Sequence, residues 1–275
     1  MPVISTNTAA NSAVRYLNIN SAQESSSLAK LSSGSKINQA SDDAAGLAIS
    51  TRISSDVTAL QQAATNASQA TSILQTADGG ASNISDILSR MKSLASESSS
   101  GTVTDSSRAY LQSEFSQLSS EIDSIATGTR YSGQSLLDGT SSFSGTGSKI
   151  LVGSSSTDTI TVTLSSLTAT TLGTTALDIS TQAGATTALT SLDTAIDKVS
   201  TARASIGAQE SRFNFSASSI STQSENLKSA NSAITDVDIA AEQSKLSSAK
   251  VKTQAAVSAE AAANELPQYL LKLLG

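Results

Sequence analysis

Residues 192–234 read LDTAIDKVSTARASIGAQESRFNFSASSISTQSENLKSANSAI, and this stretch decides the fold of the chain. A large apolar residue stands at every seventh position, seven times in succession. A sustained seven-residue repeat predicts a long helix that winds left-handedly around a partner. At 1.5 Å per residue the helix would be about 64 Å long. The coiled-coil seam consists of Leu192, Val199, Ile206, Phe213, Ile220, Leu227 and Ile234.

The positions between these seam residues are mixed in character. Two of them are the charged residues Arg203 and Glu210. Polar residues inside a seam weaken it but fix its register and the number of partners. The alternative is that both side chains lie at the edge of the seam and are solvated.

Two further stretches in the interior of the chain have helical periodicity. The only prolines are Pro2 and Pro267, so helices between them meet no proline. A second long helix is predicted from Ile53 onward, and a shorter one is predicted to end near Gly128. The seam of the second long helix comprises Val57, Leu60, Ala64, Ala67, Leu74, Ala77, Ala81, Ile84, Leu88, Met91 and Ala95.

Both ends of the chain are weakly amphipathic. Alanine-rich helices with so few large apolar residues gain little free energy from burial, too little to offset the conformational entropy lost on ordering. We therefore expect them to stay mobile until other copies of the chain cover them. The N-terminal seam is predicted at Val14, Leu17, Leu28 and Leu31, and the C-terminal one at Leu246, Ala249, Ala256, Ala263, Leu266, Leu270 and Leu273.

The segment from about residue 137 to residue 190 differs from the rest. Ser, Thr and Gly make up more than half of it. The stretch TDTITVTL alternates threonine with apolar residues, which is typical of a strand, and KILVG at 149–153 is a second candidate. We therefore expect a small β-hairpin region carried on helical rods. A disordered Ser/Thr linker is the competing interpretation.

The composition removes most catalytic chemistry. The chain of 275 residues has no Cys, His or Trp. This excludes histidine-assisted nucleophiles, conventional zinc sites and thiol redox chemistry. We expect no enzyme, no bound metal and no cofactor.

Charge and hydropathy also limit the classes of partner that the chain is expected to bind. The formal net charge is −6, and the basic residues form no stripe of the kind that binds nucleic acid. No apolar run reaches the length of a membrane span, which requires about 18 residues. The first twenty residues lack the pattern of a cleaved signal peptide, so we expect export by another route.

The stretch LSSGSKINQASDDAAGLAIS, residues 31–50, interrupts the helical pattern. Gly34 is typical of the left-handed residue that ends a helix. Ser41 is predicted to cap the next helix, with Asp42 and Asp43 in its first turn facing the helix dipole. Neighbouring carboxylates on a helix do not face the same way, so a metal site is disfavoured.

A similar interruption occurs near the other end of the chain. In ITDVDIAAE, Thr235 and Asp238 have the spacing of a capping box. Each end of the chain is therefore predicted to break its helix and restart it. Because the two restarts lie at similar distances from the termini, the two ends are expected to lie side by side.

These motifs resemble bacterial flagellin. The N-terminal matches are ISTN at 4–7, KINQASDDAAGLAIS, TADGGASNISDILSRMKSLA at 76–95 and YSGQSLLDG at 131–139. The C-terminal matches are SIGAQESRF at 205–213, ITDVDIAAE, and ELPQYLLKLL at 265–274. Ser41, Ile239 and Gly275 depart from the usual family residues, so contacts in the linker are expected to differ in detail.

The resemblance implies a mainly α fold, in which paired N- and C-terminal arms form long antiparallel coiled-coil rods with a small β-hairpin region in the middle of the chain. It implies an inner terminal-helix domain, a spoke or linker, and a rod domain without large outer domains. The corresponding ranges are 1–32 with 241–275, 33–46 with 234–240, and 47–136 with 191–233, the rod carrying the β region at 137–190.

The resemblance also implies a function and partners. The chain would polymerise with copies of itself into the extracellular flagellar filament for motility, after type III export. Its other partners would be the cap and hook-junction proteins and an export chaperone that holds the C-terminal segment. No nucleic acid and no membrane insertion are expected.

A receptor contact is a further implication. Some flagellins are sensed by Toll-like receptor 5, and Arg90, Leu94 and Glu114 match the positions involved. The alternative is that these three residues serve subunit packing.

Two other functions share part of this pattern. A hook-filament junction protein has the same terminal motifs but builds only a short collar. A surface-displayed adhesion or binding protein would use residues 140–188 to bind its target.

Overall fold

The computed structural model describes residues 6–273, and the side chains of residues 6–265. This part of the chain forms six helices and two two-stranded antiparallel sheets. It is mainly α with a small β region, as predicted. The C-terminal seam residues Leu266, Leu270 and Leu273 lie outside the described side chains. The backbone contacts divide the chain into two compact units, Met1–Ser55 with Asn226–Gly275 and Asp56–Glu225.

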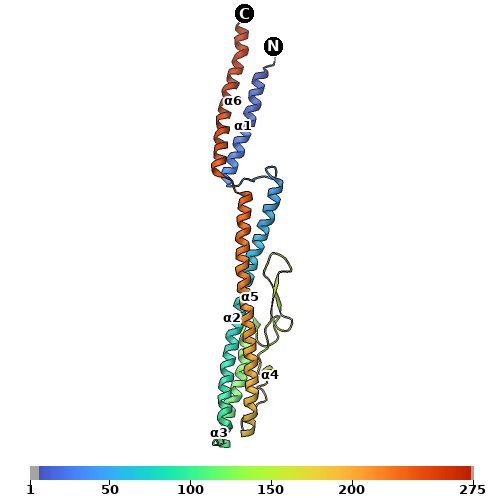
Figure 1. The fold of residues 1–275 in the computed structure, drawn as a ribbon, viewed down its shortest axis with the longest axis vertical. Helices are drawn as coiled ribbons and strands as arrows, with labels where there is room; N and C mark the ends of the chain where they lie inside the picture. Colours follow the sequence, from blue (N-terminus) through green and yellow to red (C-terminus); the bar gives the residue numbers. More distant parts are fainter. Residues whose placement is uncertain (1–5, 274–275) are drawn as a thin grey trace. The chain divides into compact units, whose positions relative to one another are not determined.

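The first unit contains helices from both ends of the chain. Helix α1 spans Thr8–Ser33 and helix α6 spans Ile239–Leu273, and the two lie side by side (Figure 1). Asn7 begins α1, since its side chain accepts a hydrogen bond from the backbone N–H of Ala10 at 3.0 Å. The start of α2 (Ala44–Ser99) and the end of α5 (Gln182–Thr235) also belong to this unit.

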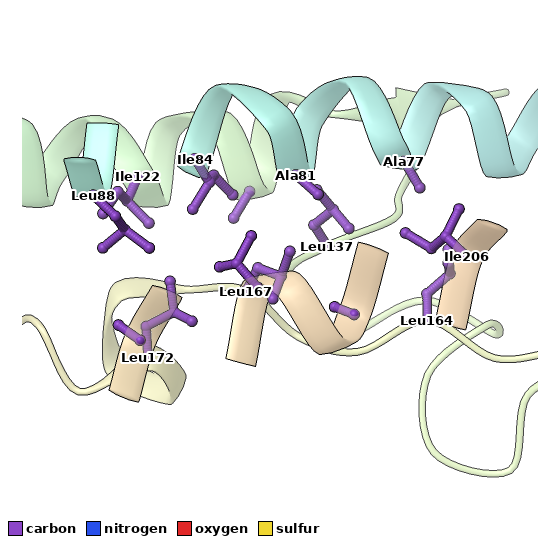
Figure 2. Packing of buried hydrophobic residues seen from close by; sticks show 14 of the residues in the cluster. Ala77, Ala81, Ile84, Leu88, Ile122, Leu137, Leu164, Leu167, Leu172 and Ile206 are labelled. Atoms are coloured by element: carbon purple, nitrogen blue, oxygen red, sulfur yellow. The ribbon is translucent and has the colours of Figure 1, made fainter. Parts of the chain in front are cut away.

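The second unit is built on α2, α3 and α5. Helix α3 spans Asp105–Gly128 and ends at the predicted glycine. Figure 2 shows part of the core, where Ala81, Ile84 and Leu88 of α2 face Leu137 and Leu167 of the middle segment. Of the predicted α2 seam all residues are buried except Ala64, whose place is taken by Ala63 at 1% exposure.

The middle segment is ordered, so the linker interpretation was wrong. Strands β1 (Arg130–Tyr131) and β2 (Gln134–Ser135) form a tight hairpin through Ser132 and Gly133, both at positive φ. Strand β3 (Ser148–Leu151) pairs with β4 (Thr159–Val162), and the predicted alternation buries Ile160 and Val162. The short helix α4 spans Ala169–Leu172.

Side chains of α3 and α5 hold residues 163–171, the part of the middle segment that leads back to α5, in place. The amide of Gln209, which is 7% exposed, accepts from Thr163 N and donates to Thr163 O, both at 2.9 Å. Asp123 accepts from Ala169 N at 2.8 Å, and Lys198 donates to Thr171 O at 2.8 Å. Because buried backbone groups need partners, these contacts allow irregular chain to pack against the helices.

Candidate functional site

The two helix breaks are bonded to each other within the first unit. Gly34 ends α1 at φ 71, in the left-handed conformation. Ser35 forms an isolated antiparallel bridge with Asp236. Lys36 N donates to Thr235 O at 2.6 Å, and Val237 N donates to Gly34 O at 3.1 Å. We call this pairing of residues 34–37 with residues 235–237 the joint.

Helix α2 begins two residues later than the sequence predicts. The carbonyl of Asp43 accepts from Leu47 N at 3.0 Å, and its carboxylate accepts from Gly46 N at 2.8 Å, so Asp43 is the N-cap. Ser41 is exposed and does not cap, and neither aspartate lies in the first turn. The Asp43 carboxylate occupies the N-cap position itself, so the first helical turn begins after it.

Asp42 has a different role from its neighbour. Its carboxylate accepts hydrogen bonds from Asn38 N at 3.0 Å and Gln39 N at 3.1 Å. These two backbone donors lower the pKa of Asp42. The carboxylate therefore closes the loop before α2, while Asp43 starts the helix.

The predicted capping box of α6 does not form. Thr235 is still helical, and its hydroxyl donates to Asn231 O at 2.9 Å. Asp238 alone caps α6, accepting from Ala241 N at 3.0 Å through its carboxylate and from Glu242 N at 2.9 Å through its carbonyl. Both helices that restart therefore begin at an aspartate.

The small residues at the start of α2 differ in how closely other atoms pack against them. A Cβ on Gly46 would lie 2.5 Å from Asp43 Oδ2 and 2.8 Å from Ile37 Cδ1. Ile37 is 7% exposed, so the joint closes over this glycine. The alanines at 44, 45 and 48 are exposed.

The α1–α6 pair buries few large apolar side chains and leaves several of them exposed. The buried positions of α6 are mostly small, and the N-terminal seam was partly wrong because Val14 and Leu28 point outward. Alanine positions suit the close approach of two helices but leave larger side chains outside. Among the side chains of this pair that the structure describes, the exposed large apolar ones are Val14, Tyr16, Ile19, Leu28, Ile239, Val251 and Val257.

The α5 seam changes along its length. Leu192, Val199, Ile206, Phe213 and Ile220 are at most 3% exposed, whereas Leu227 and Ile234 are half-buried. The seven-residue repeat is therefore buried along the second unit and partly open where α5 enters the first.

The charged residues between the seam positions are partly exposed. Arg203 donates two hydrogen bonds to Asp78 of α2, at 2.9 and 3.2 Å, with both side chains about two-fifths exposed. Burial raises the pKa of Glu210, and the negative charge of Asp78 adds to the effect. Arg203 is therefore paired at the edge of the seam.

The three residues at matched receptor positions do not share one surface. Arg90 Nε and Nη2 both donate to Glu114 Oε1, at 2.9 and 2.7 Å, and both side chains are exposed. Leu94 is 2% exposed and belongs to the core. The structure brings Arg90 and Glu114 together and places Leu94 in the packing beneath.

Sequence reasoning missed the polar contacts across the α1–α6 pair. Ser27, 1% exposed, donates to Glu242 Oε1 at 2.7 Å, and Glu242 is 5% exposed. Asn7 Nδ2 donates to Ala263 O at 2.8 Å. A signal was present, because Glu242 begins the seven-residue series that continues at Ala249, Ala256 and Ala263.

Two other observations describe what this part of the chain contains. Within residues 6–273 no helix carries an apolar stretch long enough to cross a membrane. In the same described range, His, Cys, Asp and Glu side chains form no group of three or more that could hold a metal ion.

The sequence matches known families in both arms. Residues 4–142 match the bacterial flagellin N-terminal helical region, and residues 189–274 match the bacterial flagellin C-terminal helical region. The chain belongs to the bacterial flagellin family. It is 36% identical over 274 residues to a flagellin of Halalkalibacterium halodurans, covering 99% of both chains.

Other relatives agree with this assignment. A flagellin of Listeria monocytogenes is 34% identical, covering 98% of this chain and 99% of the relative. A flagellar filament 30.7 kDa core protein of Treponema maltophilum is 34% identical, covering 99% of both. The crystal structure of Bacillus cereus flagellin has a TM-score of 0.52 at 34% identity, covering 61% of this chain and 94% of that one. The chain is a structural subunit of the bacterial flagellar filament.

Proposed function

We propose that this filament subunit joins its neighbours through the α1–α6 pair, held in place by the joint. The observation that carries the proposal is the set of large apolar side chains left exposed on a pair whose buried residues are mainly small. Burying an apolar side chain such as Ile or Val stabilises an assembly by about 1.5–3 kcal/mol. Copies of the chain that cover these side chains would supply this free energy.

The proposal assigns a role to each part of the chain. Residues 1–32 with 241–275 form the inner terminal-helix domain, and residues 33–46 with 234–240 form the linker. The rod comprises 47–136 with 191–233 and carries the β region at 137–190. The helix ends at Gly34 and Thr235 and the caps at Asp43 and Asp238 support these boundaries.

The test replaces exposed apolar side chains without touching buried ones. Ile19→Ser with Val251→Ser should raise the critical concentration for filament growth about tenfold or more. Each side chain is a little more than half exposed, so covering the two together contributes at least about 1.4 kcal/mol. The matched control, Asn18→Ser with Gln254→Ser, changes exposed polar positions on the same helices. Sedimentation of filaments grown from purified protein measures the difference.

Deletion gives the stronger form of this test. A chain that lacks residues 241–275 should form no filaments, and normal filaments from it would refute the proposal. Wild-type filaments of micrometre length would also distinguish a filament subunit from a junction protein, which forms only a collar.

The remaining assignments concern chemistry and partners. We infer that the chain acts without catalysis, which the lack of His and Cys supports. The flagellar cap and hook-junction proteins, and an export chaperone at the C-terminal segment, are proposed partners on the basis of family membership. Peptidase activity that co-purifies with metal-free filaments would contradict the first inference.

Recognition by Toll-like receptor 5 is proposed at the exposed pair Arg90 and Glu114, with buried Leu94 supporting the surface from below. Arg90→Ala should weaken receptor activation by soluble protein. Lys92→Ala, which breaks the neighbouring pair with Asp193, is the control. Equal activation by wild type and Arg90→Ala would refute this contact.

A further inference from the structure

The α1–α6 pair keeps one antiparallel register from end to end. Ser27 contacts Glu242 at one end and Asn7 contacts Ala263 at the other. The two contacts are 20 residues apart on α1 and 21 residues apart on α6, about 30 Å along each helix. The same offset places Ala13 opposite Ala256.

The apolar residues of this pair specify the register weakly. Three successive seventh residues of α6 are alanine, at 249, 256 and 263, and the next, at 270, is leucine. A slip of one repeat, about 10.5 Å, would exchange alanine for alanine at two of these three positions, so the alanines by themselves fix the alignment weakly. The backbone hydrogen bonds of the joint align the two helices at one end, and within the pair itself a side-chain contact is needed to hold the same register.

A buried carboxylate meets this requirement. Glu242 is 5% exposed, and both of its oxygens are occupied, one by Ser27 at 2.7 Å and the other by Lys245 at 2.9 Å. Lys245 lies on the same helix and would follow Glu242 in any slip. Ser27 lies on α1, so only this contact depends on how the two helices are aligned.

The slipped registers lose the contact. A slip in one direction places Glu242 opposite Asn20 and Ser27 opposite Thr235, and a slip in the other places Glu242 opposite Gly34 and Ser27 opposite Ala249. In neither case does the buried serine meet a carboxylate. The Asn20 amide could replace the donor in the first slip, whereas Gly34 offers Glu242 no side-chain donor in the second. A buried polar group without its partner is costly, and a single polar residue in a seam is known to fix register.

We propose that Glu242, through its hydrogen bond from Ser27, is the side chain within the pair that, together with the joint, determines the register of α1 against α6 in the assembled filament. The proposal rests on the proposed role of this pair in assembly and adds the residue that aligns it. A correct register matters because it fixes which apolar side chains each subunit presents to its neighbours.

The chain has no cysteine, so engineered disulfides can report the register. Ala13→Cys with Ala256→Cys marks the native alignment. Ala13→Cys with Ala249→Cys, or with Ala263→Cys, marks a slip in either direction. Filaments are collected by sedimentation and oxidised, and bonds within one chain are separated from bonds between chains by non-reducing electrophoresis.

Glu242→Ala should lower the native cross-link relative to the slipped ones by about tenfold, the factor expected for a hydrogen bond to a charged group. Glu242→Gln is the matched control, because it loses the charge but keeps an oxygen that accepts from Ser27. It should retain the native cross-link. An unchanged pattern in Glu242→Ala, or equal loss in both variants, overturns the proposal.

Ser27→Ala decides the case in which Glu242→Ala does not assemble. It keeps the carboxylate charge and removes only the cross-helix donor, and it should shift the cross-links in the same direction. A native pattern in Ser27→Ala filaments would overturn the proposal. Loss of the 13–256 cross-link in the otherwise unaltered chain would instead contradict the proposed role of the pair, so the two failures are distinguishable.

Discussion

Asp43 shows how a single side chain sets the boundary of a helix in the joint. Replacing it with alanine leaves the N–H of Gly46 without its acceptor at 2.8 Å. We expect Asp43→Ala to destabilise the start of α2 by about 0.5–2 kcal/mol. Hydrogen exchange at residues 44–48 in filaments measures this, since the exchange should accelerate accordingly.

Ser41→Ala is the matched control for this change. Ser41 is exposed and precedes the cap by two residues, so its replacement should alter the stability by less than about 0.5 kcal/mol. If the two substitutions accelerated exchange equally, Asp43 would not be the cap.

Glu242 makes the stability of the α1–α6 pair near the joint depend on pH. The hydrogen bond from Ser27 is the main reason that its pKa lies below the ordinary 4.5, and Lys245 and Lys30 act in the same direction. Since the folded pKa is lowered, the stabilisation is fully present above the ordinary value. It is lost as the pH falls through the lower, folded value.

The prediction for pH compares wild type with Glu242→Gln. At neutral pH wild-type filaments should be more resistant to urea dissociation, by about 1 kcal/mol per subunit, because a hydrogen bond to a charged group is the stronger one. The difference should vanish as the pH falls below the ordinary value of 4.5 and through the lower, folded pKa of Glu242. Parallel pH profiles of the two proteins would show that Glu242 is not responsible.

At the scale of whole elements, the α5 seam allows one substitution to be compared in two surroundings. Leu192 is 0% exposed and Leu227 is half-buried, although both occupy the same position of the repeat. Leu192→Ala should cost about 2–5 kcal/mol through lost burial and a cavity. Leu227→Ala should cost about half as much, because part of its surface is already in water.

Native-state hydrogen exchange can resolve these two costs. Amides around each substituted leucine report the local opening free energy, so Leu192→Ala should affect residues 185–206 and Leu227→Ala residues 220–234. Equal costs would mean that Leu227 is covered in solution as completely as Leu192.

The long helices were predictable from the sequence, and so were strands β3 and β4 through their alternation, while the short helix α4 was not. The repeats of α2 and α5 extend over many turns, so an error at Ala64 did not change the helix. Helix α4, by contrast, is held by Asp123 and Lys198, which lie far from it in sequence. No local pattern contains these contacts.

The joint was predictable in kind but not in detail. A glycine and several capping residues signalled a break, and breaks were found at Gly34 and Thr235. The choice between Ser41 and Asp43 depended on which side chain reached a free amide, and the bridge from Ser35 to Asp236 joins residues 201 positions apart. The spacing of residues along the sequence does not give their distances in space.

At the scale of the whole molecule, charge is divided unequally between the two units. Residues 56–225 carry 15 acidic and 8 basic side chains, while the rest of the chain is nearly balanced. The second unit therefore carries a net charge of −7 and the rest of the chain +1, which together give −6. In a filament, many copies of an acidic unit are brought near one another, and like charges oppose this.

Salt should therefore favour assembly. The screening length falls from about 10 Å at 0.1 M salt to about 3 Å at 1 M. We expect the critical concentration, measured by sedimentation, to fall as sodium chloride is raised over this range.

The variant Glu121→Gln, Asp197→Asn, Glu225→Gln removes three exposed charges that belong to no ion pair among the described residues. It should assemble at a lower concentration in low salt and respond less to added salt. Because apolar burial also strengthens in some salts, sodium chloride is compared with sulfate at equal ionic strength. A variant whose salt response equals that of wild type would show that burial, and not the charge of the second unit, sets the dependence.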